Sequence, residues 1–253
     1  MYTDTFDVIL LIVILLIVEI IAIFWAYANY LSYRKTRDTP TEEIRNLNIG
    51  YKEIKGKVVA LEKILESPLS NAPCVYYEFK VEERQPGGRL MRYKTARDTG
   101  GRSQFWKPIV DNKGVSKFGV DDGTGLAEVD IVQASLELKS KHRSRSGILN
   151  PLDDIQVAAL EKYVKKPEGS LVSKHSRLRF HEKFIKEGDE LYVLGDVESR
   201  GNDAILMTKK ENFLLVSDYL EDELIEKYRY HAKVAGVVAV GVPFILYWLF
   251  ISL

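Results

Sequence analysis

Two apolar stretches of 20 residues, one near each end of the chain, constrain this sequence more than any other feature. Residues 8–27 carry a single charge, Glu19, and residues 234–253 carry none. Each stretch is about as long as a helix must be to cross a bilayer core. All 36 Lys and Arg residues lie between them, as do all but three of the 36 Asp and Glu residues. The pattern predicts an integral membrane protein with two transmembrane helices flanking a highly charged aqueous domain, and excludes a simple soluble globule and a multi-span transporter.

The first stretch has some features of a cleavable signal peptide. Ala26-Tyr27-Ala28 resembles a cleavage site, but the preceding tail contains Asp4 and Asp7 instead of basic residues. The apolar region is also longer than the 7 to 15 residues usual in a signal peptide. We therefore interpret residues 8–27 as a retained anchor.

Basic residues next to the two stretches predict the orientation in the membrane. Arg34, Lys35 and Arg37 follow the first stretch, and Arg229 and Lys233 precede the second, whereas neither terminal tail contains Lys or Arg. Because basic flanks are retained on the cytoplasmic side, the central domain is expected in the cytoplasm and both termini outside.

Glu19 lies in the middle of the first stretch, where a charged carboxylate is costly. We interpret it as a protonated glutamic acid that hydrogen-bonds across a helix interface. A proton relay is the alternative, although neither stretch contains a second charge. The second stretch offers small residues spaced four apart, Ala232/Gly236 and Ala235/Ala239, which favour close helix packing. The two helices are expected to pair, and a homo-oligomer through them is possible.

Cysteine and charge counts exclude several classes of site. Cys74 is the single cysteine, so the sequence contains no internal disulfide and no Cys-based zinc or iron–sulfur site. The four histidines are scattered, and no nucleophile, P-loop or HExxH motif is present. We therefore expect no cofactor, no metal and no catalytic residue. The net charge is zero, which gives no reason to expect a nucleic-acid partner.

The aqueous part reads as short strands with a few helices. A juxtamembrane helix and linker (28–49) precede a β-rich domain (50–216) that carries a helical insert at about 151–166. A second juxtamembrane helix (217–233) leads into the second stretch. In residues 74–83, Val75, Tyr77, Phe79 and Val81 alternate with polar residues, which predicts a half-buried strand. A turn at 84–88 and a strand to about residue 95 complete a hairpin, and residues 118–132 form another. The fold class is α+β, with a barrel- or sandwich-like domain between two transmembrane helices.

Three acidic motifs are better explained by structure than by chemistry. Asp121 and Asp122 precede Gly-Thr-Gly and are typical of a hairpin turn, although a phosphate or metal loop is an alternative. Asp153 and Asp154 favour the first turn of a helix that we expect to begin near Pro151. The His181-Glu182 pair is interpreted as surface.

Basic residues interleaved with aromatic residues mark a candidate interaction surface. Such a pattern can bind nucleic acid or anionic lipid head groups, but it is most often a solvated face. Residues of the candidate surface are Arg89, Arg92, Lys94, Arg97, Arg102, Trp106, Lys139, Lys141, Arg143 and Arg145.

Three segments between the apolar stretches, residues 67–83, 118–130 and 179–197, together resemble a known family. They read SPLSNAPCVYYEFKVEE, FGVDDGTGLAEVD and RFHEKFIKEGDELYVLGDV. In this order they are similar to the GIDE or "beside a membrane" domain of mitochondrial membrane-anchored RING ubiquitin ligases, over about residues 50–253. The resemblance implies a membrane-flanked β-rich interaction or regulatory module. In those ligases the domain faces the intermembrane space, which is opposite to the orientation that the charges of this chain favour.

The resemblance transfers no catalytic residue, because this sequence contains no match to the cysteine ligands of a RING. The expected function is therefore a membrane-anchored, non-catalytic interaction or regulatory module. An enzymatic role stays open as an alternative, in which the chain is a ubiquitin-ligase-type component that needs a separate catalytic partner. A second alternative is a lipid- or envelope-stress-sensing membrane protein. The expected partners are the lipid bilayer and an unidentified membrane or soluble protein.

Overall fold

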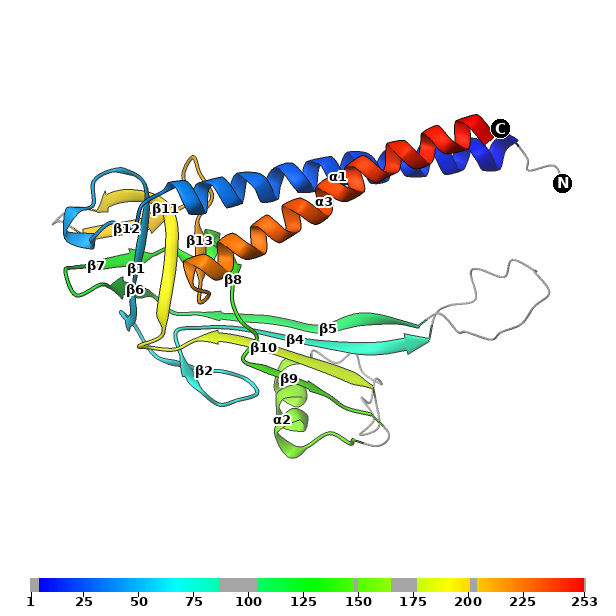
Figure 1. Cartoon of the computed structure of the whole chain (residues 1–253). Coiled ribbons are helices and arrows are strands. Elements are labelled where there is room, and N and C mark those ends of the chain that lie inside the picture. The colour runs from blue at the N-terminus through cyan, green and yellow to red at the C-terminus, as the bar shows by residue number, and fades with distance from the viewer. Residues whose placement is uncertain (1–4, 87–103, 148–149, 165–176, 201–203, 253) are drawn as a thin grey trace. The chain divides into compact units, whose positions relative to one another are not determined.

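The protein consists of two compact units. The computed structural model describes residues 5–86, 104–147, 150–164, 177–200 and 204–252 (Figure 1). One unit contains the N-terminal residues up to Glu42 together with Tyr219–Leu253, and the other spans Glu43–Asp218.

The first unit is a pair of long helices, α1 (Thr5–Asp38) and α3 (Glu221–Ser252), which run side by side with both chain ends at the same end of the pair (Figure 1). The segment Ile12–Asp38 of α1 is long and apolar enough to cross a membrane, with a mean hydropathy of 2.3. Only 6% of its 18-residue apolar window is buried in the structure, whereas the core helix of a soluble protein is mostly buried. Helix α1 is the one such helix among the described residues, so the second span stays a prediction.

Small residues of α3 that the sequence spaces four apart differ in their burial. Ala235 is fully buried, and Ala232 and Ala239 are partly buried. A Cβ added at Gly236 would meet nothing within 4 Å, so glycine is not required there. Trp25 of α1 and His231 of α3 also stack, with ring centroids 5.7 Å apart.

A closed five-stranded barrel forms the centre of the second unit. Its strands are β1 (Gly50–Ala60), β6 (Phe118–Asp121), β7 (Leu126–Val129), β11 (Glu190–Arg200) and β12 (Ala204–Thr208). The ring runs β1-β6-β7-β12-β11 and closes because β1 pairs with both β6 and β11. All neighbours are antiparallel except β7 and β12. In chain order the ring reads 1-2-3-5-4, the Greek-key arrangement of the OB-fold. The barrel alternative of the predicted fold class is therefore confirmed.

The barrel is filled by apolar side chains from every strand. Ile54, Val120, Val129, Val193 and Met207 are all at least 95% buried and belong to one cluster. Short elements extend the barrel sheet or connect it. They are η1 (Ile44–Asn46), β2 (Leu65–Glu66), β3 (Pro73–Cys74), η2 (Ile131–Gln133), β8 (Ser135–Glu137) and β13 (Leu215–Ser217).

A second, four-stranded sheet is built from insertions between the barrel strands. Its order is β5 (Gln104–Val115), β4 (Tyr76–Pro86), β10 (Leu178–Ile185) and β9 (His142–Arg145). Helix α2 (Asp154–Tyr163) covers one face, where its Ala159 and Leu160 pack in a cluster with Phe79 of β4 and Phe180 of β10. Figure 1 shows the long strands β4 and β5 within this sheet and α2 beside it. The opposite face of the sheet carries polar side chains such as Lys80 and His181, while Glu182 lies on the buried face.

Several elements differ in detail from the sequence expectations. Helix α2 begins at Asp154, not near Pro151, because Asp153 caps it in a capping box with Gln156. Strand β4 continues through the expected turn as far as Pro86. The expected second strand, up to about residue 95, lies outside the described residues. Its place beside β4 is taken by β5, which the sequence reasoning did not identify as a strand.

Candidate functional site

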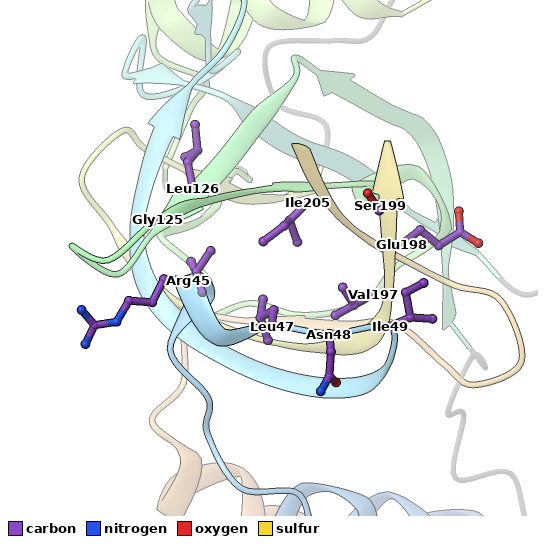
Figure 2. Close-up of a pocket in the computed structure, with 11 residues that line it drawn as sticks. Arg45, Leu47, Asn48, Ile49, Gly125, Leu126, Val197, Glu198, Ser199 and Ile205 are labelled. Carbon is purple, nitrogen blue, oxygen red and sulfur yellow. The ribbon is translucent and has the colours of Figure 1, made fainter. Parts of the chain in front are cut away.

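One open cavity in the second unit lies at one end of the barrel and has a volume of about 790 Å³. Figure 2 shows Leu47, Val197 and Ile205 directed toward its centre, whereas Arg45 and Glu198 point away. Arg45 pairs with Glu43 at 2.7 Å, and Glu198 pairs with Lys210 at 3.2 Å. Because its charges are paired and directed outward, this cavity is an apolar barrel end without converging polar groups.

Another cavity, of about 590 Å³, lies on the polar face of the four-stranded sheet. We call it the basic cavity. Its lining contains four arginines and no acidic residue. The lining residues are Arg84, Trp106, Arg145, Ser146, Gly147, Asn150, Arg177 and Arg179.

Strand pairing explains why these arginines converge. Arg179 of β10 lies opposite Arg145 of β9, and Arg84 of β4 lies opposite Trp106 of β5. The backbone N–H of Arg84 donates to the carbonyl of Arg177 at 2.9 Å, which ties β4 to the residue before β10. Side chains on one face of a sheet at paired positions lie within about 5 Å of each other at Cβ. Strands β4, β9 and β10, together with the residue that precedes β10, therefore bring guanidinium groups to one place.

A β-bulge in β5 places Trp106 on this face. Val81 pairs with Val110 and Glu82 pairs with Pro108, so Ile109 is the extra residue. Because side chains alternate along a strand, one extra residue moves every following side chain to the other face. Without the bulge, Trp106 would lie on the same face as buried Val110.

Arg179 stacks on the ring of Trp106, with its guanidinium carbon 3.6 Å from the ring centroid. A guanidinium over an indole ring is attracted by the negative face of the ring, and tryptophan gives the strongest contact of this kind. The contact favours a position of Arg179 over the ring. Its Nε is shielded from solvent and has no hydrogen-bond acceptor within the described part of the chain.

The four arginines also lack carboxylate partners among the described residues. The described acidic groups of the same face form no ion pair with these arginines, although Glu82 lies in register with Arg179 across β4 and β10. Glu78 pairs with Lys80 at 2.8 Å and Glu82 lies 3.8 Å from His181. The neighbouring arginines contribute to the pKa of His181. Burial is the main cause that lowers the pKa of this imidazole; Glu82 opposes the shift, and Arg143, Arg179 and Arg145 reinforce it.

The residues of the predicted interaction surface separate into three groups. Arg89, Arg92, Lys94, Arg97 and Arg102 lie outside the described residues. Trp106 and Arg145 line the basic cavity, and Arg143 lies opposite His181 on the same sheet face.

Lys139 and Lys141 belong elsewhere, because both contact Asp218. The backbone N–H of Lys139 donates to its carboxylate at 2.7 Å, and Lys141 forms an ion pair with it at 3.0 Å.

The sequence reasoning missed Arg84, Arg177 and Arg179. Arg84 was assigned to a turn, and Arg179 was read as part of a strand without a face. The alternation of Leu178, Phe180, Glu182 and Phe184 could have identified the opposite face of that strand, because these four side chains are all at least 94% buried.

The interpretation of His181-Glu182 as surface was wrong for Glu182, which is fully buried. It lies on the face opposite to the basic cavity. Its carboxylate accepts hydrogen bonds from the backbone N–H of Leu69 at 2.7 Å and of Ser70 at 3.1 Å, and from the Ser70 hydroxyl. Glu182 therefore anchors the β2–β3 connection to β10.

Asp122 also has a structural role in this fold. It accepts hydrogen bonds from the backbone N–H groups of Ile44, Thr124 and Gly125. Burial raises the pKa of Asp122, but the hydrogen bonds outweigh burial and lower it below its usual range. The loop after β6 is thus a hairpin turn whose carboxylate holds η1 against the barrel.

Glu19 lies partly exposed on α1.

Comparison with known proteins identifies one family. The GIDE family model, described as E3 ubiquitin ligase, matches residues 90–250, which is more than half of the chain. The match contains Trp106, Arg145, Arg177 and Arg179 of the basic cavity, while Arg84 precedes it. No curated protein matches the chain.

Proposed function

The chain belongs to the GIDE family, described as E3 ubiquitin ligase, and we propose that it acts as a membrane-anchored, non-catalytic module that binds an anionic partner. One observation carries the proposal: four arginines line one cavity without a carboxylate among the described residues. Guanidinium groups without acidic partners leave a large uncompensated positive charge, which favours binding of an anion.

Membrane anchoring is supported by the apolar segment of α1 and by the uncharged sequence of residues 234–253. We propose that both helices cross the bilayer. The basic flanks Arg34, Lys35, Arg37, Arg229 and Lys233 then favour a cytoplasmic second unit with both chain ends outside.

A non-catalytic role is supported by the state of Cys74. This thiol is fully buried, and burial raises its pKa to about 11, with Glu182 adding to the shift. A buried thiol with a raised pKa is a poor nucleophile, so Cys74 is unsuited to carry ubiquitin as a thioester. A single cysteine also cannot supply the ligands of a RING zinc site within these 253 residues.

Nucleic acid fits the barrel poorly, although OB-folds often bind oligonucleotides. The strands that usually form that binding face, β6 and β7, contain Asp121 and Glu128 but no Lys or Arg. The fold alone therefore does not argue for this ligand, because one fold hosts many functions.

Two further functions remain candidates. The family description favours a ligase-type component that works with a separate catalytic partner. A lipid- or envelope-stress sensor would use the same anchor and the same basic face. Both include a binding step at the basic cavity, so the tests below begin with that step.

Site-specific photo-cross-linking of the full chain in its native membrane tests the binding role. A photoreactive residue at Arg177, which is exposed at the basic cavity, should form adducts that mass spectrometry identifies. Arg145→Glu in the same chain should abolish these adducts. Arg45→Glu, at the paired arginine of the barrel end, is the matched control and should leave them unchanged. Adducts that survive Arg145→Glu would refute binding at this cavity.

Two assays test the remaining parts of the proposal. Full-length protein incubated with activating and conjugating enzymes and ubiquitin should form no ubiquitin chains; chain formation that depends on the protein would refute a non-catalytic role. A reporter fused after Leu253 should be active only as an extracytoplasmic reporter. Activity of a cytoplasmic reporter at this position would overturn the orientation.

A further inference from the structure

We propose that the basic cavity recognises a phosphate monoester; this inference rests on the binding role proposed above and specifies the group that is bound. The four arginines carry four positive charges around one cavity of about 590 Å³. A monoester carries close to two negative charges at neutral pH and offers three terminal oxygens as acceptors. A carboxylate offers one charge and two oxygens, so it would leave more of the positive charge uncompensated.

The geometry of the guanidinium groups supports this choice. Each presents N–H donors in a planar fork that matches two oxygens of a phosphate group. The guanidinium carbon of Arg179 lies over the Trp106 ring, 3.6 Å from its centroid, and its shielded Nε has no acceptor among the described residues. Buried donors are normally paired, so an unpaired one at a cavity is explained by an acceptor that arrives with a ligand.

The extent of the positive charge argues against a nucleic-acid strand. A single strand needs a groove that continues for several nucleotides. Further along the strands, the same sheet face carries Glu78 and Asp111 beside Lys80, and Glu82 lies opposite Arg179 and beside His181. The acidic residues confine the positive charge to the cavity. Its volume lies in the range of small-molecule sites, about 300–1,000 Å³.

Trp106 provides a direct measurement of binding. The chain contains three tryptophans, Trp25, Trp106 and Trp248, so Trp25→Phe with Trp248→Phe leaves Trp106 as the single reporter. Full-length protein of this background, in nanodiscs of phosphatidylcholine, is titrated with sn-glycerol 3-phosphate. We expect a saturable change in Trp106 fluorescence. Glycerophosphocholine, the diester of the same group, should bind at least about tenfold more weakly, because it has fewer terminal oxygens and one charge.

Arginine variants assign the response to the cavity. Arg145 is exposed, and its side chain forms no ion pair with another described residue, so Arg145→Ala should preserve folding. It should weaken glycerol 3-phosphate binding about tenfold or more. Arg179→Lys keeps the charge but loses the guanidinium fork over the Trp106 ring, and should also weaken binding about tenfold. Arg45→Ala is the matched control and should bind as the parent protein does. An unchanged unfolding midpoint verifies that the variants are folded.

A second arm distinguishes a lipid source from a soluble source of the phosphate. Nanodiscs that contain phosphatidic acid present the same monoester on a lipid. If this head group reaches the cavity, Trp106 fluorescence changes before titration and soluble glycerol 3-phosphate binds more weakly. If the titration is the same in both nanodiscs, the monoester comes from a soluble compound. Either result supports the assignment to a monoester.

Three results would overturn the inference: no fluorescence response to the monoester, equal affinity for the diester, or unchanged binding in Arg145→Ala. These results are separable from failure of the proposed function. If glycerol 3-phosphate does not bind but Arg145→Glu still abolishes the cross-links, the binding role stands and the phosphate assignment falls. If the monoester binds but the cross-links survive, the binding role falls alone.

Discussion

Substitution of Glu182 should destabilise the four-stranded sheet more than any exposed carboxylate change. Its fully buried carboxylate is the acceptor for three donors of the β2–β3 connection: the N–H groups of Leu69 and Ser70 and the Ser70 hydroxyl. A hydrogen bond to a charged group contributes about 1.5–3 kcal/mol, and a buried donor left unpaired costs about 1–3 kcal/mol. Because the connection can relax, the three contributions are not additive.

We therefore expect Glu182→Ala to lower the free energy of unfolding by about 3–5 kcal/mol. Glu182→Gln keeps one carbonyl oxygen as an acceptor but turns an amide group toward the remaining donors, so it should cost about 1–2 kcal/mol. Ser70→Ala combined with Glu182→Gln should cost less than the sum of the two single changes, with a coupling of about 1 kcal/mol.

The assay is guanidinium unfolding of the full chain in detergent, followed by Trp106 fluorescence in the Trp25→Phe, Trp248→Phe background. Trp106 lies on β5 of the same sheet and reports its unfolding. Glu190→Ala and Glu190→Gln are matched controls, because Glu190 is 60% exposed and 3.7 Å from Lys55, and each should change stability by less than about 0.5 kcal/mol. If Glu182→Ala costs no more than Glu190→Ala, the anchoring role is refuted.

Three further predictions concern other parts of the molecule. Burial is the first cause of the lowered pKa of His181, so the unfolded chain binds the proton more readily than the folded chain. The free energy of unfolding should therefore decrease as the pH falls through about 6.5 and below. His181→Gln should flatten this dependence in unfolding midpoints measured between about pH 7.5 and 5.5. Gly56→Ala should destabilise the barrel by about 1–3 kcal/mol or more, because its Cβ would lie 2.4 Å from the carbonyl oxygen of Asp121, while Gly236→Ala should be tolerated. Glu19→Gln should preserve membrane insertion, assembly and cellular function, since the amide keeps its hydrogen-bonding capacity; loss of function with intact assembly would show that ionisation matters.

The periodicity of the sequence was sufficient to predict a β-rich domain. It does not predict which strands pair, because pairing depends on residues that are distant in the sequence. Alternation in residues 74–83 identified β4, whose Phe79 and Val81 are fully buried. Closure of the barrel depends on β1 pairing at once with β6 and β11, and no local pattern encodes that register.

Strand β5 shows a different limit of sequence reasoning. It contains Pro108, Asp111, Asn112 and Gly114, which are unfavourable in strands, so local propensity argues against a strand there. Pairing with β4 overrides that propensity, and Pro108 is tolerated because β5 is an edge strand. The bulge at Ile109 then determines which face Trp106 occupies, which cannot be read from residue types alone.

The basic cavity was only partly predictable for the same reason. The sequence places Trp106 in one stretch of basic and aromatic residues and Arg143 and Arg145 in a second, separate basic cluster. Arg84 and Arg179 come from strands about 95 residues apart in the chain, and they meet only because β4 and β10 pair from Tyr76 to Glu83.

The position of the cavity in the fold explains how an OB-type barrel can acquire a new site. Arg84 and Trp106 belong to the insertion between β1 and β6, and Arg145, Arg177 and Arg179 belong to the insertion between β7 and β11. No barrel strand contributes a lining residue. The cavity therefore forms when two insertions pair through β4 and β10, while the barrel holds their ends. Because the barrel core does not take part in the lining, residues of the two insertions can change the ligand without altering the residues that close the barrel. This separation of the cavity from the barrel predicts where ligand specificity is determined. Among proteins of this architecture, differences in ligand should follow from residues of β4, β5, β9 and β10, and not from residues of the barrel strands.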